Sequence, residues 1–173
     1  MTRTPMAGRA TTLIAALVVV MLPSAAVAHA QSSAPLNGRF LAISNGDWAQ
    51  TNDSYRNEVT VRSTWTIAST CTEGDICSGQ VTSDQGWTAP LRKQNDTWIV
   101  DRDLPDWEPC PDGTTQPGHQ KIRFWRVAAD GSQDYSGQSP VFAGEDKTVG
   151  QSGACGINKW LAIRMPFSLQ QID

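Results

Sequence analysis

Hydrophobic and polar residues alternate with a period of two along most of the chain beyond residue 38. The stretch 58–68 shows this most clearly. Its apolar residues Val59, Val61, Trp65 and Ile67 all lie at odd-numbered positions, and the even-numbered positions between 59 and 67 carry threonines and an arginine. A strand with one apolar and one polar face is half-buried, with its apolar face on a core. The pattern therefore predicts a β-strand in this stretch, with Trp65 in the core.

The same alternation predicts seven further short strands, with turn-forming residues such as Asn95-Asp96 and Asp130-Gly131 between them. No window in this region has the 3.6-residue period of a helix of ordinary length. The stretches 104–120 and 131–156 lack clear alternation and are predicted to be loops. We expect an all-β, single antiparallel domain of about eight strands, either a meander barrel or a two-layer sandwich. The further strands are expected at 39–43, 78–83, 89–93, 97–101, 121–128, 160–165 and 167–172.

The first thirty residues have the parts of a secretory signal peptide. Arg3 and Arg9 supply the positive charge, Leu13–Leu22 is an apolar run, and small residues precede Gln31. The apolar run is too short to span a bilayer, which takes about 20 residues. We therefore predict a secreted, extracellular or cell-envelope associated protein. Its expected segments are a signal peptide at 1–30, a flexible leader at 31–37 and a secreted β domain at 38–173.

Charge and length after export restrict the classes of partner. Removal of residues 1–30 from the 173-residue chain leaves 143 residues, enough for one domain with a core of its own. Arg3 and Arg9 are lost with the signal peptide, so 12 of the 14 basic residues remain against 17 acidic ones, a net charge of −5. A mildly acidic protein gains no attraction to phosphate backbones or anionic lipid. We therefore expect no nucleic-acid partner and no integral membrane segment after processing.

All four cysteines lie in the exported part of the chain, where an oxidising compartment favours disulfides. Four cysteines allow three connectivities. Pairing Cys71 with Cys77 closes a short polar turn that contains a glycine, and this leaves Cys110 to pair with Cys155. The spacings do not form the C-x₂-C pairs of a zinc site, and His119 is the only other soft ligand. The sequence therefore favours two disulfides, no metal site and no cofactor.

Motifs for the common hydrolytic chemistries are missing from the sequence. His119 is the one histidine that remains after export, and no serine lies in a G-x-S-x-G motif. A phosphate-binding glycine-rich loop, an H-E-x-x-H motif and a calcium-binding loop are also absent from the sequence. We therefore assign no catalytic residue from these motifs.

One acidic cluster has the residue types that glycoside hydrolysis would need. Asp101, Asp103, Asp106 and Glu108 lie close together in sequence, and Trp107 among them offers a surface on which a sugar ring could stack. Glycosidases use two carboxylates that flank the scissile bond. Solvated carboxylates at a strand end would give the same pattern. A small hydrolase that acts on cell-wall glycan is therefore kept as an alternative function.

Seven tryptophans are the most unusual feature of the composition. Strand parity places Trp98 on the same face as Val100, and so in the core with Trp65. Trp125 has the parity of Arg123, and Trp160 has the parity of Arg164, which points both tryptophans away from the core. Exposed aromatic rings beside arginines are typical of surfaces that bind sugars or proteins, although the arginine stems can also simply cover the rings. The candidate binding surface consists of Arg123, Trp125, Trp160 and Arg164.

One group of motifs is spread over most of the chain beyond residue 38: Gly38-Arg39-Phe40, the segment 65–71 that ends with a cysteine, the segment 77–83 that begins with one, Trp98, and Cys110-Pro111-Asp112-Gly113. In these motifs the chain resembles the small secreted β-rich proteins of mycobacteria and related actinobacteria that carry two disulfides. That group has no established catalytic residues. The resemblance therefore implies export and a β-rich fold, and it carries over no site residue.

The sequence thus favours a secreted, non-enzymatic binding or envelope-associated domain whose partner is a cell-envelope glycan or protein. Two alternatives stay open: a small cell-wall glycan hydrolase that uses the Asp101–Glu108 cluster, and a structural protein of the envelope. Catalytic turnover of glycan would distinguish the hydrolase from the binding domain.

Overall fold

The computed structural model describes residues 1–2, 34–72 and 76–173. The predicted signal peptide at 1–30, apart from its first two residues, and the start of the leader at 31–33 lie outside the described residues. Within the described ranges, no helix has the length and apolar character needed to cross a bilayer.

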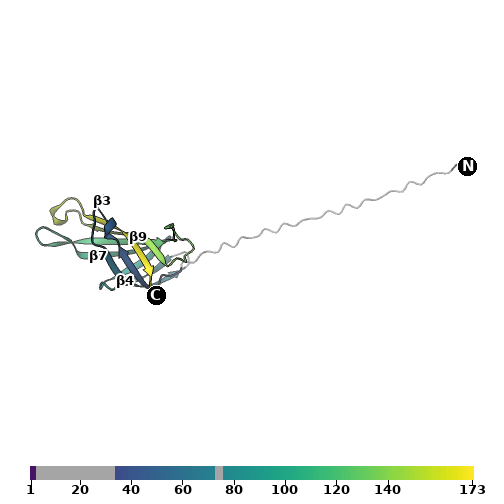
Figure 1. Ribbon diagram of the computed structural model, residues 1–173, viewed down its shortest axis with the longest axis horizontal. Coiled ribbons are helices and arrows are strands. Elements are labelled where there is room, and N and C mark those ends of the chain that lie inside the picture. Colours follow the sequence, from purple (N-terminus) through teal and green to yellow (C-terminus); the bar gives the residue numbers. More distant parts are fainter. Residues whose placement is uncertain (3–33, 73–75) are drawn as a thin grey trace. The chain divides into compact units, whose positions relative to one another are not determined.

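The described chain forms a closed, eight-stranded antiparallel barrel (Figure 1). Neighbouring strands follow chain order, and the first barrel strand pairs with the last, from Phe40 opposite Gln171 to Ser44 opposite Phe167. This pairing closes the sheet, so the prediction of an all-β meander is confirmed as a barrel. A two-stranded hairpin, β2–β3, is added to the edge of β10. The strands are β1 (Gly38–Ser44), β2 (Gln50–Thr51), β3 (Ser54–Tyr55), β4 (Val61–Thr72), β5 (Ile76–Ser83), β6 (Thr88–Gln94), β7 (Thr97–Pro109), β8 (Thr115–Arg126), β9 (Val141–Gly150) and β10 (Ala162–Gln171).

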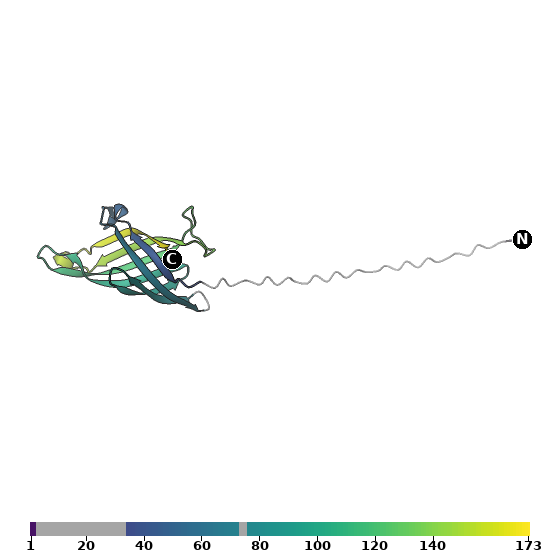
Figure 2. The ribbon, with the colours of Figure 1, turned by 60° about the horizontal axis from the view of Figure 1, so that its bottom comes forward.

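The two ends of the barrel differ in their connections. At one end, here called the hairpin end, lie the β5–β6 turn, the β7–β8 turn and the β9–β10 connection with its short 3-10 helix η2 (Ala154–Gly156). Figures 1 and 2 show the β7–β8 hairpin extending beyond the other strands, beside the segment that contains η2. The disulfide Cys110–Cys155 joins these two segments. The disulfide Cys71–Cys77 joins opposite positions of β4 and β5 at the other end, so the predicted connectivity is confirmed.

The barrel interior changes from apolar to polar along its axis. Away from the hairpin end it is packed with aromatic and aliphatic side chains, including Phe40, Phe124 and Phe142 in edge-to-face contact. Trp65 and Trp98 are 2% and 4% exposed, which confirms their predicted place in the core. Toward the hairpin end, the same strands place polar residues inside the barrel. These buried polar residues include Ser44, Ser63, Gln120, Asp146 and Thr148.

Two predictions about the long connections are wrong, and the polar half of the barrel explains both. The stretch 104–120 is not a loop, because β7 and β8 continue as a hairpin with a register shift between Leu104 and Glu108. The stretch 131–156 contains β9, which the alternation did not indicate. The inward positions of β9 beyond Phe142 are glycine, aspartate and threonine, since they face the polar interior. A strand that lines a polar cavity lacks the apolar alternation on which the prediction rested.

The predicted strands at 160–165 and 167–172 form one strand, β10. Pro166 lies where the neighbour of β10 changes from β2 to β1, so its missing N–H interrupts neither ladder. Its carbonyl accepts the N–H of Asn45. The strand predicted at 58–68 begins only at Val61, and Val59 is 83% exposed. The apolar face of that strand is therefore shorter than its sequence pattern indicated.

Candidate functional site

Three residues of the predicted binding surface lie on β8 and β10, the two strands that flank β9 in the barrel wall, and the fourth lies just before β10. Arg123 and Arg164 are linked through Glu145 of β9, whose carboxylate oxygens lie 3.2 Å from Arg123 Nη2 and 3.3 Å from Arg164 Nε. Trp125 is half-buried opposite Ala143. Trp160 precedes β10 and is 55% exposed. Of the four, Trp160 and Arg164 line one pocket, and Trp125 and Arg123 do not.

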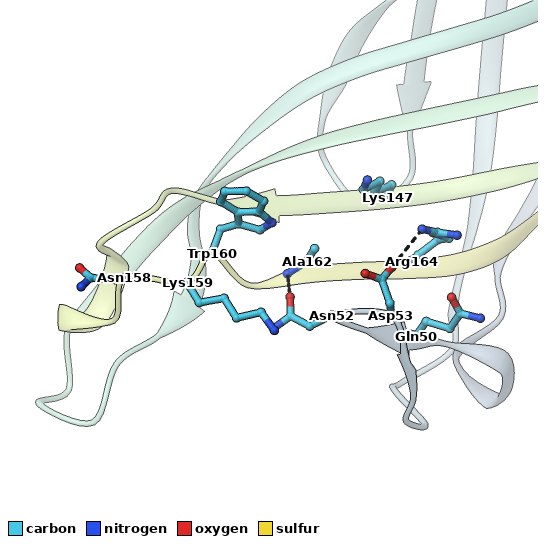
Figure 3. A pocket seen from close by; sticks show the side chains of 9 residues that line it. All are labelled: Gln50, Asn52, Asp53, Lys147, Asn158, Lys159, Trp160, Ala162 and Arg164. Carbon is cyan, nitrogen blue, oxygen red and sulfur yellow. Dashed lines mark hydrogen bonds and ion pairs between the residues drawn. The ribbon is translucent and has the colours of Figure 1, made fainter.

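This pocket, here called the wall pocket, has a volume of about 580 Å³ and lies between β2, β9, β10 and the β9–β10 connection. The β2–β3 turn forms one side of it. Asn52 holds this turn against β10, because its backbone N–H donates to Ala162 O at 2.8 Å and its Oδ1 accepts the N–H of Ala162 at 3.0 Å. Asn52 and Asp53 have φ angles of 48° and 67°, the left-handed conformation that asparagine and aspartate tolerate in a tight turn. Figure 3 shows the residues that line the pocket: Gln50, Asn52, Asp53, Lys147, Asn158, Lys159, Trp160, Ala162 and Arg164.

The wall pocket carries an excess of positive charge. Its one acidic residue, Asp53, lies 3.4 Å from Arg164 Nη2 and has a strongly exposed side chain. Within the described part of the chain, the ammonium groups of Lys147 and Lys159 form no ion pair with a carboxylate. Three amide side chains, Gln50, Asn52 and Asn158, supply further donors and acceptors. The pocket thus combines an exposed indole, two unpaired cations and amide groups.

A second cavity, here called the mouth cavity, opens the polar half of the barrel at the hairpin end and has a volume of about 360 Å³. Its buried wall comes from β1, β4, β8, β9 and β10. Its half-buried wall consists of Trp87, Arg102, Leu104, Trp107 and Met165.

Asp146 lies in the wall of the mouth cavity with only 2% of its surface exposed. Its carboxylate accepts hydrogen bonds from Ser44 Oγ at 2.6 Å and from Gln120 Nε2 at 2.8 and 2.9 Å. Burial raises the pKa of Asp146 above its usual range, although these hydrogen bonds and the charge of Arg102 act in the opposite direction. A buried carboxylate is costly unless it is paired, and here its hydrogen-bonding capacity is well used.

Arg102 is connected to Asp146 through Gln120. Its Nε donates to Gln120 Oε1 at 2.6 Å, which fixes the orientation of the Gln120 amide. Its guanidinium carbon lies 4.0 Å from the ring centroid of Trp87, a cation–π contact. Burial lowers the pKa of Arg102, and the charge of Asp146 opposes this shift. The two terminal Nη groups of Arg102 donate no hydrogen bond to any of the described residues.

Trp107 lies against two glycines of the inner barrel wall. A Cβ at Gly118 would come within 2.6 Å of its ring, and a Cβ at Gly150 within 3.2 Å. Any larger residue at Gly118 would therefore displace the indole. Trp107 was expected in an acidic loop, and the sequence pattern did not indicate Arg102, Gln120 or Asp146. Strand parity could have shown that these polar residues point into the barrel, since they have the same parity as the core residues of their own strands.

The acidic cluster does not form a pair of carboxylates across a cleft. Burial tends to raise the pKa of Asp101, but its hydrogen bond and ion pair with Arg92 and its ion pair with Lys121 lower it overall. Asp103 lies 2.8 Å from His119 Nδ1, and Asp106 accepts a hydrogen bond from Thr115. The fourth residue, Glu108, has a buried Oε2 without a hydrogen-bond partner among the described residues. None of the four acidic residues lines the wall pocket or the mouth cavity.

No known protein-family model matches the chain, and no curated protein matches it in sequence. Among solved structures, the chain is similar to the monomer form of the PknI sensor domain of M. tuberculosis, with a TM-score of 0.57 and 14% sequence identity. The alignment covers 82% of this chain and 90% of the sensor domain. The likeness is one of fold. At this identity it carries no residue of a site from one protein to the other.

Proposed function

We propose that the protein is a secreted, non-enzymatic binding domain that attaches to an anionic glycan of the cell envelope through the wall pocket. The observation that carries this proposal is the 55% exposed indole of Trp160 at a pocket where Lys147 and Lys159 have no acidic partner among the described residues. An exposed indole leaves apolar surface in water, and with two unpaired cations nearby it is well suited to a ligand that has an apolar face and a negative charge.

The chemistry of the pocket fits a sugar acid. The flat face of a sugar ring stacks on an indole, and side-chain amides match its hydroxyl groups because each amide offers both donors and an acceptor. The two lysine ammonium groups provide charge-assisted hydrogen bonds to carboxylates or phosphates on the glycan. The surface is open, which suits a chain that passes through the pocket.

Two further observations support an extracellular binding role. The two disulfides are the kind that persist in oxidising compartments. The fold is shared with a protein described as a sensor domain. A small barrel with a binding pocket on its wall is compatible with recognition without turnover.

Retention on isolated cell wall tests the proposal. Wild-type protein, Trp160→Ala and the double variant Lys147→Gln/Lys159→Gln are compared in a sedimentation assay with insoluble peptidoglycan. Trp48→Ala is the matched control, because Trp48 is 65% exposed and does not line the wall pocket. We expect both pocket variants to lose roughly 10-fold or more in affinity, while the control binds as wild type does. Equal retention of Trp160→Ala and wild type would refute the proposal.

The same preparation distinguishes the hydrolase alternative. Release of soluble, labelled glycan by the wild type, abolished by Asp103→Asn or Glu108→Gln, would indicate an enzyme. Binding without release of glycan supports the binding domain.

A further inference from the structure

We propose that the mouth cavity is a second binding site, separate from the wall pocket, and that it takes a small organic acid. In this proposal Arg102 binds the carboxylate, and the indole of Trp107 and the side chain of Leu104 contact the hydrocarbon part. This inference does not depend on the proposed function, because it concerns the inside of the barrel and different residues.

The polar network inside the barrel holds Arg102 in place and leaves its outer edge free. Asp146 supplies the opposite charge, but its oxygens are occupied by Ser44 and Gln120. Gln120 accepts from Arg102 Nε, and the guanidinium carbon lies over the ring of Trp87. The terminal Nη groups, which form the fork that binds carboxylates in a bidentate manner, have no hydrogen-bond partner among the described residues.

The arrangement of charges in the cavity fits one carboxylate at the free edge of Arg102 better than a doubly charged group. Arg102 is its one cationic lining residue among those described, and Asp146 is its one anionic lining residue. A ligand with a single carboxylate would pair with the free edge of the guanidinium, whereas a doubly charged phosphate would also be repelled by Asp146. Partial burial of Arg102 reduces the screening by water and strengthens such a pair.

One part of the cavity wall is apolar, beside the polar side chains that surround Asp146. Trp107 is seated on Gly118 and Gly150, and Leu104 and Met165 also line the space. The volume of about 360 Å³ is at the lower end of the range for small-molecule sites, roughly 300–1,000 Å³. The ligand class is therefore an aliphatic or aromatic acid of modest size.

Binding is measured by titration calorimetry with octanoate and benzoate, and with the neutral amides octanamide and benzamide as matched controls. We expect the acids to bind with a Kd of roughly 0.1–1 mM and the amides at least 10-fold more weakly. Arg102→Gln should weaken the binding of both acids roughly 10- to 100-fold. Arg102→Lys keeps the charge but lacks the fork, and we expect it to bind weakly as well.

Three further variants make the outcome decisive. Arg39→Gln is the matched arginine control, since Arg39 pairs with Asp173 and does not line the cavity, and it should bind as wild type does. Leu104→Trp fills the cavity without changing Arg102, and should abolish binding of octanoate. Trp160→Ala should leave octanoate binding unchanged, which separates this site from the wall pocket. Equal binding of acids and amides, unchanged binding by Arg102→Gln or Leu104→Trp, or no saturable binding of the acids to wild type below about 10 mM would each overturn the proposal.

Discussion

The role of a single residue in this barrel depends on whether its side chain points inward and on which half of the barrel it lies in. Inward positions in one half carry aromatic side chains, whereas inward positions in the other half carry Ser44, Gln120 and Asp146. Parity along the strand correctly predicted that Trp65 and Trp98 are buried and that Trp160 is exposed. The mouth cavity was not predicted, because polar residues at inward positions look like ordinary surface residues unless their parity is compared with that of the core residues on the same strand.

The two kinds of tryptophan should differ in their contribution to stability. Trp65 packs against Phe124 and Phe167, and its Nε1 donates to Ser63 Oγ. Trp65→Ala should therefore lower the free energy of unfolding by about 3–5 kcal/mol, whereas Trp160→Ala should change it by about 0.5 kcal/mol or less. Urea unfolding of both variants measures this difference. An equal loss in both would mean that Trp160 is a packing residue and not part of a binding surface.

Asp146 should make stability depend on pH in the direction opposite to that of an ordinary paired carboxylate. Its pKa is raised in the folded state, so the folded protein binds the proton more readily than the unfolded chain. The resulting stabilisation is full below the unfolded value of 3.8 and is lost as the pH rises through the raised pKa.

The variant Asp146→Asn cannot titrate at this position, so comparison with wild type isolates the contribution of Asp146 to the pH dependence of stability. The free energy of unfolding of wild type minus that of Asp146→Asn should decrease as the pH is raised from about 3 to about 7. Denaturant unfolding of both proteins at several pH values measures this difference. A difference that stays constant or increases with pH would contradict the raised pKa of the buried Asp146.

At the scale of elements, the sequence pattern predicted the strands that face an apolar core and missed the strands that do not. β4, β5 and β6 were found nearly at their true positions, because one face of each lies on the core. β9 was missed, and the outer parts of β7 and β8 were taken for a loop, because they line the mouth cavity or extend beyond the barrel. The wall pocket was predicted only in part. Lys147 and Asn52 reach it through pairings of β10 with β9 and β2 that no local pattern reveals.

The two disulfides should contribute unequally to stability. Cys71–Cys77 closes a separation of 6 residues, and Cys110–Cys155 closes one of 45 residues. On the chain-entropy model these bridges contribute about 2.4 and about 4 kcal/mol. The double variant Cys110→Ser/Cys155→Ser should therefore lose more stability in urea unfolding than Cys71→Ser/Cys77→Ser. The reverse order would show that the β7–β8 hairpin and the η2 segment are held together without their bridge.

At the scale of the whole molecule, the predicted export would determine which chain carries out the proposed function. Cleavage after Ala30 would begin the mature chain at Gln31, and a second small-residue site would begin it at His29. Intact-mass measurement of the exported protein should show one of these two starts and no free thiol. A product that retains Leu13–Leu22 would contradict the signal peptide.

The binding proposal is tested most directly by observing the seven tryptophan side chains during a titration. Each indole N–H gives its own signal in a ¹H–¹⁵N correlation spectrum, and soluble anionic peptidoglycan fragments are compared with a neutral chitin oligosaccharide. We expect the Trp160 signal to shift saturably with the anionic fragments, and the signals of the buried Trp65 and Trp98 to stay in place. Saturable binding that leaves the Trp160 signal unchanged would contradict the account, and so would the absence of any shift.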